Sequence, residues 1–153
     1  LKQLVSLPVD ESLFSDLAVA AVLHEAGLGE FIERMNDTDA DGAPWDMVLS
    51  GGQKQKLVLA RVLLHKPSVI SLADATGALD PASKMLFHEA LKTRCPQAIV
   101  ISIMHEDKLP LLGNGQNVYS HVLDIRNGYV SLRPVQFDTM PDAAVETPLI
   151  AAE

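Results

Sequence analysis

Residues 68–74 read Ser-Val-Ile-Ser-Leu-Ala-Asp, and residues 98–105 read Ala-Ile-Val-Ile-Ser-Ile-Met-His. Each stretch is a short apolar run, rich in β-branched residues, of the kind that forms a buried strand. Between them, Pro81 suits the first turn of a helix that extends to about Thr93. A strand, a helix and a strand within this length predict a βαβ unit with parallel strands, and therefore an α/β fold.

Two candidate functional residues follow these strands directly. Asp74 comes after the first run, and His105 comes after the second. Sites in open parallel sheets lie at the carboxyl ends of the strands, so we expect this carboxylate and this imidazole to converge at one sheet edge. Such a pair can orient a water molecule, hold a metal or contact a phosphate. The alternative is that both residues only end their strands.

A glycine-rich helix start precedes the first strand. Residues 49–53 read Leu-Ser-Gly-Gly-Gln, and Ser50 with Gln53 fits a capping box. The capping box leaves Gly51 and Gly52 unexplained, although each costs about 1 kcal/mol in a helix relative to alanine. Two glycines suit the close approach of a ligand to the backbone, and the free N–H groups of a helix start bind anions.

The remaining elements are predicted from residue spacing and turn residues. Helical segments are expected at 13–26, 30–35 and 51–65. The Asn-Gly pair at 127–128 predicts a β-hairpin between the apolar runs 118–125 and 129–132. From Phe137 onward the sequence has no periodicity, so we expect a mobile tail.

Composition excludes several classes of protein. The chain has 153 residues, of which 48% are hydrophobic, and a net charge of −8, which argues against broad nucleic-acid binding. Its one cysteine excludes an internal disulfide. No apolar run reaches the ~18–20 residues that span a bilayer. Residues 37–42 match the first half of a calcium loop, but position twelve would be Val48 rather than Glu, which favours an exposed acidic loop.

Taken in order, these motifs resemble the ATP-binding-cassette (ABC) family, which carries a Leu-Ser-Gly-Gly-Gln signature, an apolar strand ending in Asp-Glu, an Ala-Leu-Asp loop and a switch histidine. The resemblance covers roughly residues 13–129, and the run ending at His105 looks most like the peroxisomal fatty-acyl transporter branch and its bacterial relatives. It implies the C-terminal portion of a P-loop NTPase ABC ATPase domain. A partial domain is expected at 1–136 and a mobile tail at 137–153. The partial domain comprises a helical signature subdomain at about 10–65 and the remainder of the catalytic core at about 66–133. This remainder contains the parallel strands and a C-terminal β-hairpin.

The resemblance also implies roles for individual residues. Two nucleotide-binding domains of this family sandwich two ATP molecules with Mg²⁺. The residues that would contact ATP held by the other domain are Ser50, Gly51, Gly52 and Gln53. Asp80 would lie in a loop at the dimer interface, His105 would contact the γ-phosphate, and Asp74 would polarise the attacking water. The implied partners are a second nucleotide-binding domain, identical or different, and a transmembrane domain, fused upstream or separate, at the cytoplasmic face of a membrane, with no nucleic acid.

The sequence departs from the family pattern in three ways, the smallest of which is Gly77, where the family usually has Ser. It has no Gly-x-x-x-x-Gly-Lys-Ser/Thr phosphate loop, so we expect a fragment of a longer domain that is inactive alone. The Asp-Glu pair reads Ala73-Asp74: Ala73 replaces the Mg²⁺ aspartate, or, in a register shifted by one, Ala75 replaces the catalytic glutamate. One carboxylate is missing in either register. The alternative function is therefore a degenerate, non-hydrolysing module that dimerises when ATP binds. A soluble family member in DNA repair or translation is disfavoured, because neither heptads nor a second signature occurs.

Overall fold

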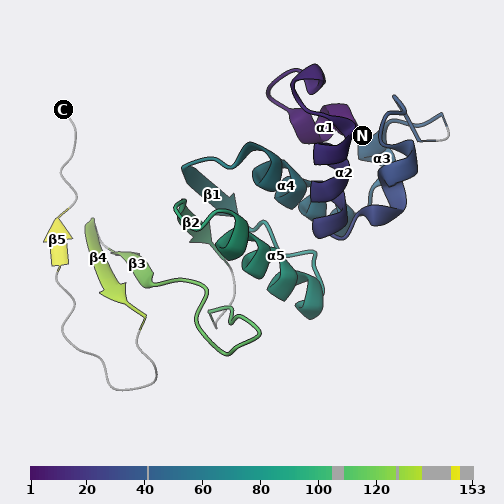
Figure 1. The fold of residues 1–153 in the computed structure, drawn as a ribbon. Helices are drawn as coiled ribbons and strands as arrows, with labels where there is room; N and C mark the ends of the chain where they lie inside the picture. The colour runs from purple at the N-terminus through teal and green to yellow at the C-terminus, as the bar shows by residue number, and fades with distance from the viewer. Residues whose placement is uncertain (41, 105–108, 127, 136–145, 149–153) are drawn as a thin grey trace. The chain divides into compact units, whose positions relative to one another are not determined.

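The computed structural model describes residues 1–40, 42–104, 109–126, 128–135 and 146–148. The chain forms two compact units, Leu1–Asp107 and Lys108–Glu153. Figure 1 shows that the helices belong to the first unit and that the second contains a small sheet. The expected division into a domain at 1–136 and a tail at 137–153 stays a prediction, since most of that tail lies outside the described residues.

The first unit begins with a series of helical segments. They are α1 (Lys2–Ser6), η1 (Glu11–Leu13), α2 (Asp16–Glu25), η2 (Gly29–Arg34), α3 (Trp45–Val48) and α4 (Gly51–His65). The predicted helices at 13–26 and 51–65 are α2 and α4, and the predicted segment at 30–35 is the 3-10 helix η2. The sequence did not predict α1, η1 or α3, because such short elements span too few residues to show a helical period.

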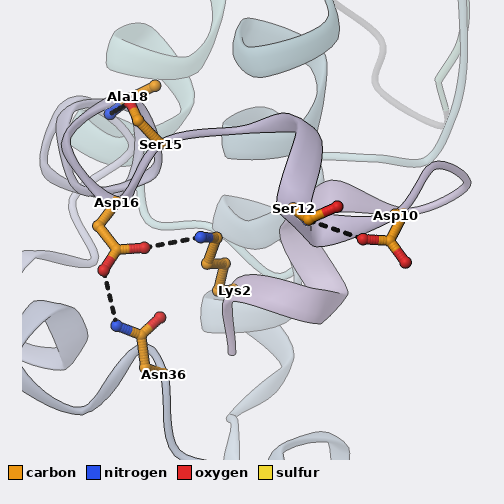
Figure 2. A network of polar contacts seen from close by, with 7 residues as sticks. All are labelled: Lys2, Asp10, Ser12, Ser15, Asp16, Ala18 and Asn36. Carbon is orange, nitrogen blue, oxygen red and sulfur yellow. Dashed lines mark hydrogen bonds and ion pairs between the residues drawn. The ribbon is translucent and has the colours of Figure 1, made fainter.

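Polar contacts around Asp16 tie the N-terminal segments together (Figure 2). Lys2 donates a hydrogen bond from Nζ to Oδ1 of Asp16 at 2.6 Å, and Asn36 donates from Nδ2 to Oδ2 at 3.0 Å. The bond from Lys2, followed by the bond from Asn36, lowers the pKa of Asp16. The carboxylate at the start of α2 therefore holds α1 and the segment after η2 in place.

The predicted βαβ unit follows α4. It consists of β1 (Val69–Ala73), α5 (Pro81–Arg94) and β2 (Ile99–Ile103). The two strands pair in parallel, in a register that runs from Val69 opposite Ile99 to Ala73 opposite Ile103. The structure therefore confirms the parallel strands that the short crossover predicted. It also places the carboxyl ends of β1 and β2 side by side.

One face of this two-stranded sheet is exposed, which differs from the expectation that both strands are buried. Ile70 and Leu72 are each 4% exposed and belong to the core. On the other face, Ile99 and Ile103 are 63% and 64% exposed. Successive side chains of a strand point to opposite faces, so covering one face leaves alternate residues in solvent. An apolar run indicated a strand but not the number of layers packed against it.

The core of the first unit lies between its helices and the covered face of the sheet. Its largest fully buried side chains are Leu23 of α2, Leu28 just after α2, Leu59 and Leu63 of α4, and Phe87 of α5. Burying a Leu or Phe side chain contributes about 1.5–3 kcal/mol each relative to exposure. This core fixes α4 against α5 and β1, and thereby positions the residues that follow β1.

The second unit contains a three-stranded antiparallel sheet of β3 (His121–Arg126), β4 (Tyr129–Pro134) and β5 (Glu146–Pro148). Arg126 pairs with Tyr129, which confirms the predicted hairpin, and Gly128 has a φ of 80° that suits its turn. Asn127 lies outside the described residues. The strand β5 falls within the segment expected to be a mobile tail. Within the described residues, no helix has the length and apolar character needed to cross a membrane.

Candidate functional site

The start of α4 has the capping box that the sequence predicted. The backbone N–H of Gln53 donates to Oγ of Ser50 at 3.2 Å, and the backbone N–H of Ser50 donates to Oε1 of Gln53 at 2.8 Å. Nε2 of Gln53 also donates to Oε1 of Glu30 at 3.0 Å. The Gln53 side chain is therefore engaged at both ends, while Ser50 remains exposed.

The two glycines of the helix start lie against the chain's own loop. A Cβ at Gly52 would be 3.1 Å from the carbonyl oxygen of Ala78, and a Cβ at Gly51 would be 3.5 Å from Cβ of Ala78. The sequence suggested a ligand as the reason for this pair. The structure supplies a second reason at Gly52, because the first turn of α4 packs closely against residues 74–80. We call these two segments together the α4/loop site.

Asp74 is the first residue after β1, at the carboxyl edge predicted for it. Its backbone N–H donates to the carbonyl oxygen of Ile103 at 3.0 Å, so it lies beside the end of β2. Its φ of 50° is left-handed, a conformation that aspartate tolerates better than most residues. His105 lies outside the described residues, so the convergence of Asp74 with His105 stays a prediction.

The Asp74 carboxylate folds back over Gly77. A Cβ at Gly77 would meet Oδ1 of Asp74 at 2.7 Å and Oδ2 at 2.9 Å. A side chain at position 77 would therefore force the carboxylate to rotate. The absence of a side chain at Gly77 permits the observed position of Asp74.

Within residues 73–79, all of which the structure describes, Asp74 is the one carboxylate. Ala73 is exposed beside it, and the described residues contain no group of three or more His, Cys, Asp and Glu side chains that could hold a metal ion. In nucleotide sites Mg²⁺ is held by one or two carboxylates together with substrate phosphates. The residues present therefore fit Mg²⁺ only together with a nucleotide.

Asp80 ends the loop and begins α5. Its Oδ1 accepts from the backbone N–H of Ser83 at 3.0 Å, and its Oδ2 accepts from Oγ of Ser83 at 2.7 Å. The bond from the backbone N–H, followed by the bond from the hydroxyl, lowers the pKa of Asp80. Asp80 is thus an exposed N-cap, and its expected place at a dimer interface stays a prediction.

The fall of the unfolding free energy at acid pH is expected to depend on Asp80. Because its pKa is lower in the folded chain, the ionised carboxylate stabilises the fold above the unfolded pKa of about 3.9, and this contribution is lost as pH falls through the folded value. Asp80→Asn keeps a capping oxygen but cannot titrate, so its unfolding free energy should fall less steeply below pH 4. Urea unfolding between pH 3 and pH 6 measures this, with Asp46→Asn, at an exposed position of α3, as the control. An unchanged slope would contradict the prediction.

The sequence did not single out Gln55, which joins the two parts of the α4/loop site. Its Nε2 donates to the carbonyl oxygen of Asp74 at 3.2 Å, and its Oε1 accepts from the backbone N–H of Ala78 at 2.9 Å. A glutamine inside a predicted helix carries no local signal of such a contact. Only its partners, 19 and 23 residues away along the chain, reveal it.

Comparisons with known proteins relate the chain to ABC transporter proteins. The chain is 33% identical over 100 residues to the inner membrane ABC transporter ATP-binding protein YddA of Escherichia coli, covering 65% of this chain and 16% of that protein. It is 33% identical over 127 residues to the ABC-type transmembrane transporter verA of Clonostachys rogersoniana, covering 81% of this chain and 9% of that protein. The chain spans about a sixth of the length of the first curated relatives it matches.

A solved structure supports the same relationship. A bacterial Atm1-family ABC exporter with ATP bound matches 76% of this chain and 21% of its own, with a TM-score of 0.57 and 26% identity. No family model matches the chain. About three quarters of the chain therefore has a counterpart in a protein of known structure.

Proposed function

The chain is a homologue of the ABC transporter ATP-binding proteins, and from this premise we propose that it forms part of a nucleotide-binding domain that drives transport by ATP-dependent dimerisation. The observation that carries the proposal is the α4/loop site. There, an exposed glycine-rich helix start packs against the loop that contains Asp74 and Asp80. The helix start proposed to bind phosphate and the carboxylate proposed to polarise water thus belong to one surface.

In this proposal the start of α4 binds the phosphates of an ATP molecule held by a second domain. The free N–H groups of Gly51 and Gly52 and the helix dipole favour an anion, and the Ser50 hydroxyl adds a donor. Gln53 would exchange its bond to Glu30 for a contact with the nucleotide. The charge of this end therefore suits the γ-phosphate.

The loop after β1 would supply the groups for hydrolysis. Asp74 would polarise the attacking water, and His105 would contact the γ-phosphate. Mg²⁺, when bound with ATP, would neutralise phosphate charge, which together with positioning makes up most of the catalysis of phosphoryl transfer. Asp80 would lie where the loop meets the second domain.

The complete protein would supply the phosphate loop and the transmembrane domain that this chain does not contain. The chain matches only a small share of its relatives, so we propose that a phosphate loop and a transmembrane domain lie elsewhere in the complete protein or in a partner. The nucleotide-binding part would then stand at the cytoplasmic face of a membrane. The comparisons do not favour the alternative of a non-hydrolysing module, whose test is given in the Discussion.

The proposal is tested by a substitution that keeps the N-cap and adds a charge. Aspartate caps helices as well as serine, so Ser50→Asp should leave the unfolding free energy within about 0.5 kcal/mol of the original. Its carboxylate would repel a phosphate, and we expect ATP-dependent association of the nucleotide-binding domains to be lost. Fluorescence energy transfer between labelled domains of the complete protein measures this association.

A matched control is Ser15→Asp, the same change at the N-cap of α2, where Oγ accepts from the N–H of Ala18 at 3.2 Å. This variant should associate with ATP as the original does. Ser50→Ala should lose about 1 kcal/mol of stability through the missing cap. Unchanged ATP-dependent association in Ser50→Asp would overturn the proposal.

A further inference from the structure

We propose that Gln55 is a positioning residue, which holds Asp74 in place for hydrolysis and joins that position to the ATP-contacting start of α4. The inference rests on the proposed function of the α4/loop site. One amide side chain uses both of its ends on the loop, since Nε2 donates to the Asp74 carbonyl and Oε1 accepts from the Ala78 N–H. These two bonds span the loop from its first residue to the residue beside Gly52.

The other hydrogen bonds described for the loop do not attach it to α4. The N–H of Gly77 donates to the carbonyl of Asp74 at 3.4 Å, and the N–H of Leu79 donates to the carbonyl of Thr76 at 3.1 Å. Both bonds are internal to the loop and shape it without attaching it to a helix. Between residues 75 and 79, the one described backbone N–H that bonds to α4 is that of Ala78, through Gln55.

Asp74 is a residue whose conformation needs support from its surroundings. Its left-handed φ of 50° is unfavourable for a residue with a Cβ, and such conformations persist where neighbouring groups determine them. The bond from Ile103 fixes the amide side of Asp74, and the bond from Gln55 fixes the carbonyl side. Without Gln55, the Asp74 carbonyl keeps only the 3.4 Å bond from the Gly77 N–H, which lies within the loop, and the carboxylate over Gly77 loses its attachment to α4.

The same contacts make the helix start and the loop move together. A Cβ at Gly52 would lie only 3.1 Å from the Ala78 carbonyl oxygen. Gln55 lies three residues further along the same helix, α4. A shift of the first turn of α4 on binding a phosphate therefore reaches Ala78 by contact and Asp74 through the Gln55 amide. Gln55 thus ties the phosphate-binding end of α4 to the water-polarising carboxylate.

Two variants separate the two bonds of Gln55. Gln55→Ala removes both, whereas Gln55→Glu keeps an acceptor for the Ala78 N–H and loses the donor to the Asp74 carbonyl. In the complete protein, we expect amide exchange of peptides covering 74–80 to become at least tenfold faster in Gln55→Ala. In Gln55→Glu, exchange at Ala78 should stay near the original, while both variants lower kcat about tenfold with the KM for ATP within twofold.

The control is Gln3→Ala, at an exposed helical glutamine of α1, which should change neither readout. Peptides from α5 report global stability and should keep their exchange rates in all variants. Unchanged exchange at 74–80 in Gln55→Ala would overturn the inference, as would equally faster exchange in α5. A complete protein that neither binds nor hydrolyses ATP would refute the proposed function instead, while the exchange data would still decide whether Gln55 holds the loop.

Discussion

The double substitution Ala73→Asp with Asp74→Glu is expected to raise ATP turnover of the complete protein about 100-fold or more. Only one of the two carboxylates of the family's Asp-Glu pair is present at 73–74, and a missing catalytic group typically costs ~10²–10⁴-fold in rate. Ala73 is exposed at the end of β1, so an aspartate there needs no buried space. The glutamate at 74 is longer than the present aspartate and would extend beyond Gly77, over which the carboxylate now folds. Steady-state ATPase assays on the purified complete protein measure the effect.

A second variant tests the register shifted by one. In that register Asp74 already holds Mg²⁺ and Ala75 occupies the catalytic place, so Ala75→Glu would supply the missing carboxylate. Ala75 is half-buried against the core, so a glutamate there disturbs packing. We therefore expect a smaller gain from Ala75→Glu than from the double substitution.

The control for both variants is the isosteric pair Ala73→Asn with Asp74→Gln, which has the same shape without carboxylates and should lower turnover below the original. Turnover of the double-carboxylate variant equal to that of the original would show that Ala73-Asp74 does not limit hydrolysis. That result would remove the reason for the alternative of a module that binds ATP and dimerises without turning it over.

Phe87→Ala is expected to lower the unfolding free energy by about 3–5 kcal/mol. Phe87 is 0% exposed and belongs to the core that holds α5 against the sheet. Its ring also meets the ring of His88 edge to face, with the ring centroids 5.7 Å apart. The substitution removes these contacts and leaves a cavity that the surrounding core fills only in part. Equilibrium urea unfolding followed by circular dichroism measures the loss.

The neighbouring Leu86→Ala is the matched control, because Leu86 is 41% exposed on the same helix. We expect it to cost less than about 1 kcal/mol. A loss below about 1.5 kcal/mol for Phe87→Ala would mean that the core collapses around the missing ring.

Much of the architecture could be predicted from local patterns. The capping box at Ser50, the apolar residues of α4 and the proline at the start of α5 each act within a few residues, so the sequence displays them directly. The short crossover between two apolar runs indicated parallel strands, and the Asn-Gly pair indicated the hairpin. The short segments α1 and α3 escaped prediction because their helical form depends on neighbours that pack against them.

The sequence alone determined the order of the motifs, and with it the family and the candidate residues from Ser50 to Asp80. Only the tertiary structure decided which of them touch: Gly52 against the Ala78 carbonyl, the Asp74 carboxylate over Gly77, and Gln55 bonded to both ends of the loop. It also decided which face of β1 and β2 is covered. The physical reason is that caps, turns and periods are set by interactions within a turn or two of the chain. Contacts between a helix and a loop about 20 residues apart exist only after the core between them has packed.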